Sequence, residues 1–280
     1  MPGLILEGGT FRPIFSCGVM DALLEHGLMF DYVIGVSAGI TNAVSYVSRQ
    51  PGRNLDVICK YRNDPRYLSY GNYLKCGSLF GLDFVYDEVP NRLNPFDWEA
   101  YRAYEGRVLV GVTNARTGLP EYLDGRALDE KCTMLRATCA IPFFFPPIYL
   151  DGTPYFDGGL TDPIPIRRAL ADGSQKNLIV LTRTEDYRKT LGNSTRWAAR
   201  ALRLRFPALP GVLHDRHRIY NETVQFASEL AREHPETTVL LRPAHPVESF
   251  ESDVSRLRAA YQEGYDMAQA RMDEIRALFT

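Results

Sequence analysis

The sequence predicts an α/β fold, a three-layer sandwich in which a mostly parallel central sheet lies between helices. Apolar runs of strand length alternate with helical patterns along the chain, which is typical of such sandwiches. One apolar run, Tyr32–Val36, leads through the motif Gly-x-Ser-x-Gly into a helical pattern. A strand, a tight turn and a helix in this order predict a nucleophile elbow near the N-terminus, with Ser37 at its tip.

Ser37 is the candidate nucleophile of this elbow, because the turn would expose its hydroxyl at the end of a strand. Gly35 and Gly39 flank it, and only residues without a Cβ let neighbouring backbone pack so closely. An ordinary structural turn is the alternative interpretation. The strand before the motif and the helix after it favour a catalytic site.

Length and composition favour one domain over residues 1–280, because a chain with 45% hydrophobic residues can bury a large core. The 32 Lys and Arg nearly balance the 34 Asp and Glu, and a net charge of −2 predicts no nucleic-acid partner and no general attraction to anionic membranes. The five cysteines form no Cys-x-x-Cys pair, which argues against disulfides and zinc. With no leader pattern and no run of membrane-spanning length, we expect a cytoplasmic protein.

A second strand, loop and helix unit opens the chain. The apolar run at residues 4–7 breaks at Gly8 and Gly9, and a helical pattern follows at residues 14–25. Backbone N–H groups at such a loop suit a phosphate or the oxyanion of an acyl-transfer intermediate, although a tight turn alone would also explain two glycines. Because the next strand carries Ser37, two adjacent parallel strands would bring loop and nucleophile to one sheet edge.

Residues 51–99 lose the periodic pattern and predict a helical and loop-rich excursion, which either caps the site or is a surface insertion. The elements expected beyond it are strands at residues 107–113, 121–123, 148–150, 154–156, 178–182 and 238–242, and helices at residues 128–140, 165–173 and 253–278.

Asp157 is the candidate base. It ends the second strand of a hairpin that Asp151-Gly152 predicts, and Gly158 and Gly159 follow it. A carboxylate followed by two glycines can approach another backbone closely, as a base beside Ser37 must. A polar turn is the alternative.

Residues 194–213 form a basic amphipathic stretch. Its basic face carries Arg196, Arg200 and Arg203, and its apolar face carries Trp197, Ala201 and Leu204. Two interpretations stay open: the apolar face packs on the body of the protein, or the stretch is a lid or touches a membrane surface.

Together, Gly8-Gly9, the motif around Ser37 and Asp157-Gly158-Gly159 resemble the patatin-like phospholipases in order and spacing. The resemblance extends to Arg12, where that family carries Arg or Lys after its glycine-rich stretch, and to a Pro-containing block at residues 139–147. It implies a Ser-Asp dyad, an oxyanion hole near Gly8 and Gly9, and hydrolysis of lipid acyl esters without a metal or other cofactor.

The chain departs from the family pattern at two positions of the loop. Thr10 replaces the third glycine, and Pro13 follows Arg12 where glycine is usual. A Cβ at residue 10 restricts the backbone and Pro13 has no N–H, so we expect the donors at Gly8, Gly9 and Thr10.

A carboxylate is a weak base, so burial near Phe143, Phe144 and Phe145 would have to raise the Asp157 pKa. These aromatics fit a core or an acyl pocket equally well. His245 is placed in the chain where an α/β-hydrolase triad has its histidine. That fold needs several strands before the elbow strand and only one precedes it here, so we predict a dyad.

An acyl-enzyme can be resolved by water or by another acceptor, so a thioesterase or acyltransferase is the alternative among enzymes. A lipid-binding or regulatory protein without turnover is the alternative from another class, because Thr10 and Pro13 alter the loop. The expected partners are a lipid or acyl-ester substrate and, at most, a peripheral membrane surface.

Overall fold

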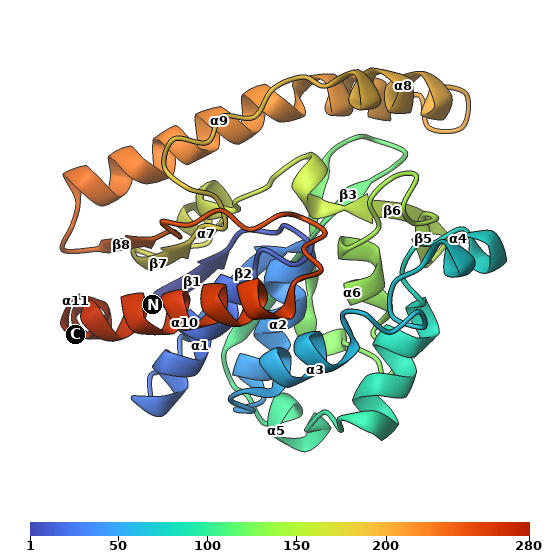
Figure 1. The fold of residues 1–280 in the computed structure, drawn as a ribbon. Coiled ribbons are helices and arrows are strands. Elements are labelled where there is room, and N and C mark those ends of the chain that lie inside the picture. Colours follow the sequence, from blue (N-terminus) through green and yellow to red (C-terminus); the bar gives the residue numbers. More distant parts are fainter.

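The computed structural model describes residues 1–280, apart from the side chains of Asn193, Ser194 and Ala198. It is a three-layer α/β sandwich with helices on both faces of a mixed, mostly parallel sheet (Figure 1), which confirms the predicted fold class. The strands are β1 (Pro2–Leu6), β2 (Tyr32–Val36), β3 (Arg107–Asn114), β4 (Pro120–Asp124), β5 (Ile148–Leu150), β6 (Thr153–Asp157), β7 (Lys176–Val180) and β8 (Thr238–Leu241).

The strand order is β5-β6-β3-β2-β1-β7-β8, with β4 paired to β3. Strands β3, β2, β1, β7 and β8 run parallel, whereas β4 and β6 pair antiparallel with β3, and β5 pairs antiparallel with β6. Leu6 of β1 pairs with Gly35 of β2. The glycine loop and the elbow therefore leave the sheet at the same edge, as the sequence predicts.

Strand β3 pairs with two strands, β2 and β6, along the same edge. On one edge, β4 pairs with both Gly111 and Val112. On the other, Gly111 pairs with Val36 at the end of β2, and Val112 pairs with Asp157 at the end of β6. The strand that leads to Ser37 and the strand that carries Asp157 thus meet end to end.

The helical segments are α1 (Ile14–Glu25), α2 (Ser37–Val47), α3 (Arg53–Tyr61), α4 (Tyr70–Cys76), the π-helical η1 (Phe84–Leu93), α5 (Trp98–Arg102), η2 (Gly125–Ala127), α6 (Thr133–Thr138), η3 (Gly158–Leu160), α7 (Ile166–Ala171), α8 (Asn193–Leu202), α9 (Leu209–Glu233), α10 (Val254–Ala270) and α11 (Met272–Ala277). Leu4 and Leu6 of β1 face one core with α1 and α10, and Ile5 faces the other with α7 and α9. The strands are apolar on both faces because both faces are covered.

The helix predicted over residues 128–140 is wrong in extent, because only α6 is helical there. Cys132 has a φ of 52°, which a helix cannot include. The Asp129 carboxylate accepts bonds from the backbone N–H (2.7 Å) and hydroxyl (2.6 Å) of Thr133, so the helix begins at Thr133.

The helix predicted over residues 253–278 is divided at Arg271 into α10 and α11. Arg271 leaves the helical conformation with ψ near 20°, and its guanidinium donates to the Leu240 carbonyl at 2.8 Å.

The sequence interpretation missed α9, the 25-residue helix that follows the basic stretch. Residues 194–213 span two helices, since α8 ends at Leu202 and α9 begins at Leu209. Pro210 lies in the first turn of α9, where its missing N–H breaks no helical bond.

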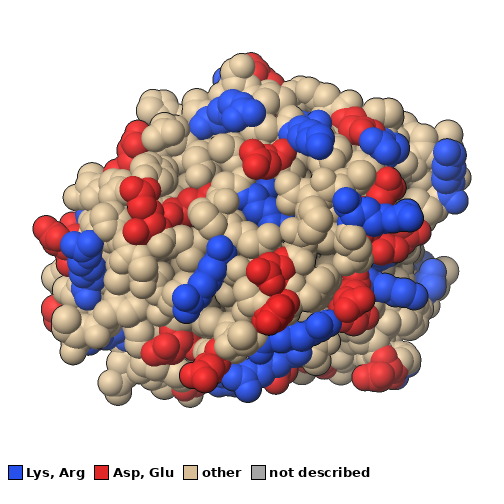
Figure 2. All heavy atoms as spheres, turned by 90° about the horizontal axis from the view of Figure 1, so that it is seen from below, with Lys and Arg blue, Asp and Glu red and all other residues tan. Residues whose placement is uncertain are grey.

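Within the described part of the chain, no helix is both long and apolar enough to cross a membrane. On the face in Figure 2, acidic and basic side chains are interspersed, so neither sign dominates that face.

Candidate active site

Ser37 lies where β2 turns into α2, with a φ of 53°. This left-handed conformation costs a non-glycine residue about 1–2 kcal/mol and is typical of functional sites. A Cβ on Gly35 would lie 2.9 Å from the Leu6 carbonyl oxygen, and one on Gly39 would lie 2.5 Å from that of Glu7. The two flanking glycines are therefore required by the close approach of β1.

The Ser37 hydroxyl donates a hydrogen bond to Oδ2 of Asp157 at 2.6 Å. Both residues are buried, with 5% and 3% of their surfaces exposed. Oδ1 of Asp157 accepts from the Gly159 backbone N–H at 2.7 Å, so both carboxylate oxygens are bonded. The structure thus brings the two sequence-predicted residues together and fixes the orientation of the carboxylate.

Thr138 connects the turn at Ser37 to strand β3, and no sequence signal pointed to it. Its hydroxyl accepts from the Ser37 N–H at 2.8 Å and donates to the Gly111 carbonyl at 2.5 Å. Gly158 is needed at the same junction, because a Cβ there would lie 2.2 Å from the Gly111 carbonyl oxygen.

The backbone N–H groups of the glycine loop, residues 8–10, form no hydrogen bond in the described structure. Among the described residues, none accepts a hydrogen bond from the N–H of Gly8, Gly9 or Thr10. The Gly8 Cα lies so close to the elbow that a Cβ on it would be 2.8 Å from the Ser37 Cβ. Gly9 has a φ of 147° and Thr10 a φ of 59°, so the third loop position keeps a left-handed backbone without a glycine. Pro13 lies directly before α1, where a missing N–H is tolerated.

Arg12 contacts this loop through both its backbone and its side chain. Its backbone N–H donates to the Gly9 carbonyl at 3.1 Å, and its Nη2 would lie 2.6 Å from a Cβ on Gly9. Its guanidinium also donates to the Ser249 hydroxyl, which belongs to the loop after β8.

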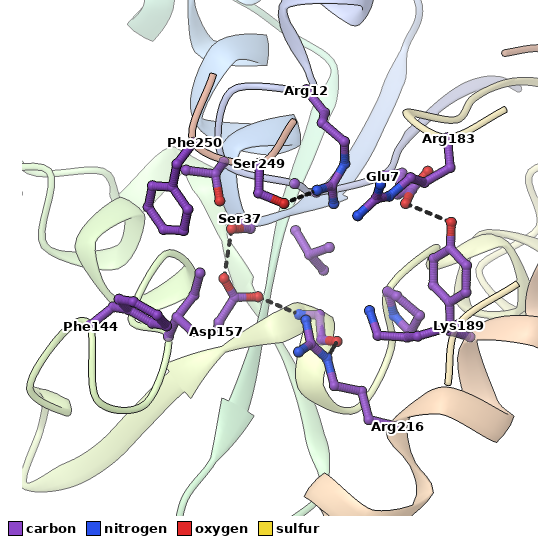
Figure 3. A pocket seen from close by; sticks show the side chains of 18 residues that line it. Glu7, Arg12, Ser37, Phe144, Asp157, Arg183, Lys189, Arg216, Ser249 and Phe250 are labelled. Carbon is purple, nitrogen blue, oxygen red and sulfur yellow. Dashed lines mark hydrogen bonds between the residues drawn. The ribbon is translucent and has the colours of Figure 1, made fainter. Parts of the chain in front are cut away.

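Ser37 and Asp157 line a chamber of about 220 Å³. Its other lining residues are Glu7, Gly8, Gly9, Thr10, Arg12, Val36, Ile141, Phe144, Gly159, Pro163, Arg183, Lys189, Arg216, Tyr220, Ser249 and Phe250. In Figure 3, four basic side chains from three segments of the chain point into this space. Sequence reasoning missed Arg183, Lys189 and Arg216. Only Arg183 had a signal, because it closely follows a parallel strand at the edge where sites form.

A second, apolar cavity of about 70 Å³ adjoins the chamber and shares Thr10, Ser37 and Ile141 with it. The rest of its lining is Phe11, Ala38, Thr41, Asn42, Ile58, Tyr67, Phe80, Val85, Tyr86, Cys139 and Phe145. Residues 51–99 supply five of these side chains. The three aromatics of residues 143–145 differ: Phe145 lines this cavity, Phe144 lines the chamber, and Phe143 is 44% exposed.

No histidine lines either cavity in the described structure. The His245 side chain is 86% exposed, and its Nδ1 lies 3.4 Å from the Glu263 carboxylate.

Comparison with known proteins matches residues 4–170 to the model of the patatin-like phospholipases. The chain belongs to the patatin-like phospholipase family. Family membership supports a lipid acyl hydrolase activity. A second model, a domain of unknown function named DUF6363, matches residues 206–280.

Among relatives of this patatin-like chain, the uncharacterized protein YjjU of Escherichia coli (strain K12) is 28% identical over 185 residues, 64% of this chain and 51% of YjjU. The lysophospholipase nte1 of Aspergillus terreus is 26% identical over 175 residues, 59% of this chain and 11% of that protein. The chain therefore spans about half or less of the length of these two relatives. The crystal structure of VipD from Legionella pneumophila aligns with a TM-score of 0.48 at 15% identity, covering 97% of this chain and 66% of VipD.

Burial raises the pKa of Asp157 in this patatin-like site. The hydrogen bond from Ser37, the charge of Arg216 and the Gly159 N–H oppose this shift but do not cancel it. A carboxyl group with a raised pKa is a better proton acceptor than an exposed one.

The raised pKa predicts that Asp157→Asn stabilises the fold at pH 7. The buried carboxylate is less favourable in the folded state than in the unfolded state, and asparagine of the same shape removes that charge. The substituted amide can still accept from the Gly159 N–H and donate to Ser37. We expect the melting temperature to rise by roughly 2 °C or more, measured by calorimetry.

The upward direction of the Asp157 pKa shift determines how this gain in stability depends on pH. Below the unfolded-state pKa Asp157 is protonated in both states, so the gain is absent there and grows as pH rises through the raised folded-state pKa. Asp273→Asn is the control, because the Asp273 side chain is fully exposed and should leave the melting temperature nearly unchanged. A lower melting temperature for Asp157→Asn at pH 7 would contradict the argument.

Proposed function

We propose that the chain is a serine acyl hydrolase that cleaves acyl esters of lipids through Ser37 and Asp157. The observation that carries this proposal is the 2.6 Å hydrogen bond between the Ser37 hydroxyl and the buried carboxylate, at the place where a polar chamber meets an apolar cavity. An ester with a polar head and an acyl chain has its reactive carbonyl between two such regions.

In the proposed reaction, Ser37 Oγ attacks the acyl carbonyl while Asp157 accepts the hydroxyl proton. Asp157 then returns that proton to the departing alcohol oxygen as the ester bond breaks, which leaves an acyl-serine. Water attacks the acyl-serine, Asp157 takes a proton from it, and Ser37 recovers its proton when the fatty acid leaves. The carboxylate thus ends each cycle as it began.

The N–H groups of Gly8, Gly9 and Thr10 are proposed to bind the oxyanion of the two tetrahedral intermediates. They lie beside Ser37 and have no acceptor among the described residues. The first turn of α2, which begins at Ser37, adds the positive end of a helix dipole at the same place.

The apolar cavity is proposed to hold the acyl chain. Beyond this apolar cavity lies a third, mostly apolar cavity, so apolar lining continues away from Ser37. The third cavity shares six lining residues with the apolar cavity: Thr41, Asn42, Ile58, Tyr67, Val85 and Tyr86. This assigns the excursion of residues 51–99 a role in the site, as the wall against which the chain lies.

Residues 1–280 are proposed to function as one unit, although two family models divide them. Strand β8 extends the central sheet beside β7, and α10 packs on α1. Arg216 of α9, with Ser249 and Phe250 of the loop after β8, lines the chamber.

Ser37→Ala and Asp157→Asn should each lower kcat/KM on chromogenic esters roughly 10³-fold or more, because each removes a member of the nucleophile and base pair. His245→Ala should keep at least about a tenth of the parent activity, since its side chain points to solvent. A fluorophosphonate should label the parent and not Ser37→Ala.

Esters of graded chain length, with product analysis, separate the alternatives. Loss in His245→Ala equal to that in Ser37→Ala, in folded protein, would make histidine the base. If the protein shows no labelling and no turnover, it is a lipid-binding protein. Transfer of the acyl group to an acceptor other than water would identify an acyltransferase.

Gly9→Ala should lower kcat roughly 100-fold, the scale of losing one oxyanion donor. Gly9 has a φ of 147° and its missing Cβ position is filled by the Arg12 guanidinium, so a methyl group displaces the loop. Gly27→Ala is the matched control. Gly27 also has a positive φ, 68°, but its Cβ would meet no atom within 4 Å, so kcat should stay at the parent value.

Contact of α8 with a lipid surface is also proposed. The apolar face of the basic stretch does not pack on the body of the protein, because Trp197 is 71% and Leu204 is 89% exposed. On α4, Tyr70 and Leu74 are 83% and 86% exposed, and α4 lies toward the same end of the molecule as α8 in Figure 1. Exposed aromatic and aliphatic side chains beside arginines are typical of interfacial helices.

Replacing Arg196, Arg200 and Arg203 together with Gln should weaken binding to anionic vesicles about 10-fold or more at low salt, and less at high salt. Turnover of a soluble ester should not change. Vesicle sedimentation measures the first quantity, and a chromogenic assay measures the second.

The control removes the same number of charges elsewhere, with Gln at Arg218, Arg232 and Arg276, which all pair with neighbouring acids. Equal vesicle binding by the two triple variants would show that α8 has no special contact with lipid.

A further inference from the structure

Four basic side chains converge on the chamber beside Ser37 and Asp157. Arg12 comes from the loop before α1, Arg183 and Lys189 from the segment after β7, and Arg216 from α9. Figure 3 shows all four cationic ends directed into the same space. On the face shown in Figure 2, by contrast, acidic and basic side chains are interspersed.

These four cations have few partners of their own in the described structure, and none forms an ion pair with a carboxylate there. The Arg12 guanidinium donates to Ser249, but its Nε is buried without an acceptor. Arg216 donates through Nε to the Gly159 carbonyl at 3.1 Å. Arg183 lies over the ring of Tyr187 and Lys189 over that of Tyr220, at 4.1 and 4.8 Å from the ring centres.

The two acids of the chamber, Glu7 and Asp157, are bonded elsewhere. Glu7 accepts from the Thr182 N–H at 2.6 Å and from the Tyr220 hydroxyl at 3.1 Å, and Asp157 is bonded to Ser37 and Gly159. Four positive groups therefore face two negative ones. With every one of these six groups ionised, the chamber has a formal excess of two positive charges.

These buried like charges disfavour one another. Burial and the neighbouring charges of Arg216 and Arg12 lower the pKa of Lys189 to about 7. Burial likewise lowers the pKa of Arg12 and of Arg216. A bound anion would relieve this repulsion and hold Lys189 in its charged form.

We propose that the chamber binds a phosphate monoester, so that the substrates are acyl esters of glycerol phosphate with a free terminal phosphate. This inference rests on the proposed function, since it places the ester carbonyl at Ser37 and the phosphate among the four cations. A phosphate monoester carries a charge of about −1.5 to −2 at pH 7, which matches the excess. A phosphodiester or a carboxylate supplies only about half of this negative charge. A choline or ethanolamine head group would add a fifth cation to the four already there.

The substrate preference is measured as the ratio of kcat/KM for 1-acylglycerol 3-phosphate to that for the monoacylglycerol with the same chain. Lys189→Gln and Arg183→Gln should each lower this ratio about 10- to 100-fold, the scale of one charge-assisted contact. Lys189→Arg should keep this ratio within about 3-fold of the parent value, because arginine keeps the positive charge. Arg218→Gln, on the exposed side of α9, is the control and should leave the ratio unchanged.

Binding is tested separately from turnover, by calorimetry on the parent and on Ser37→Ala. Glycerol 3-phosphate should bind, more weakly as salt is added, whereas glycerol and glycerol 3-phosphocholine should not. If no ester is hydrolysed but glycerol 3-phosphate binds, the proposed function fails and the anion site stands.

Two outcomes would overturn the assignment itself. Hydrolysis of esters without a preference for the phosphate, and with equal ratios in all variants, would remove the anion site and leave the hydrolase. Binding of inorganic phosphate and of glycerol 3-phosphate without any effect of Lys189→Gln on relative turnover would mean that the anion is not part of the substrate.

Discussion

The candidate site depends on one edge of β3 that two strands share. Strand β2 stops at the rung of Gly111 and β6 stops at the next rung, Val112, so their ends meet without a gap in the pairing. The hydroxyl of Thr138 ties the Ser37 N–H to the Gly111 carbonyl, and the hydroxyl of Thr113 donates to the Asp157 carbonyl at 2.8 Å. A serine and a carboxylate 120 positions apart in the chain are thereby held within hydrogen-bonding distance by backbone pairing.

The same arrangement sets a conflict between stability and proposed function. A carboxylate that is to accept a proton from Ser37 needs a raised pKa, and burial raises it only by making the charged form less favourable. The Gly159 N–H and the charge of Arg216 offset part of that cost while leaving the shift in place. Left-handed Ser37 and Thr10 add backbone strain at the same site. Such a site is stable because strands β1, β2 and β3 beneath it are paired along both edges and are almost entirely buried.

The sequence revealed the parts of this site that depend on local backbone geometry. Gly35, Gly39 and Gly158 stand where a Cβ would strike a carbonyl, so their pattern identified the elbow and the approach of the carboxylate. Thr138 and Arg216 lie far from these motifs in the chain, and only the packing of α6 and α9 brings them in, so no local pattern could identify them. Helix α9 itself was missed because helix-breaking residues and charges dominate the pattern around its start.

The apolar cavity and the charged side of the chamber take their lining from different parts of the chain, and this separates their chemistry. Residues 51–99 supply apolar walls such as Tyr67 and Phe80, whereas the segments after β7 supply the charged wall with Lys189 and Arg216. Ser37 and Asp157 lie between them, at the ends of strands that belong to neither. Since the strand pairing that holds Ser37 and Asp157 does not involve either wall, we expect substitutions in one wall to alter the proposed acyl or head-group preference without moving the hydroxyl and carboxylate. The second matched family region, residues 206–280, lies on the charged side of this division, through Arg216 and Ser249.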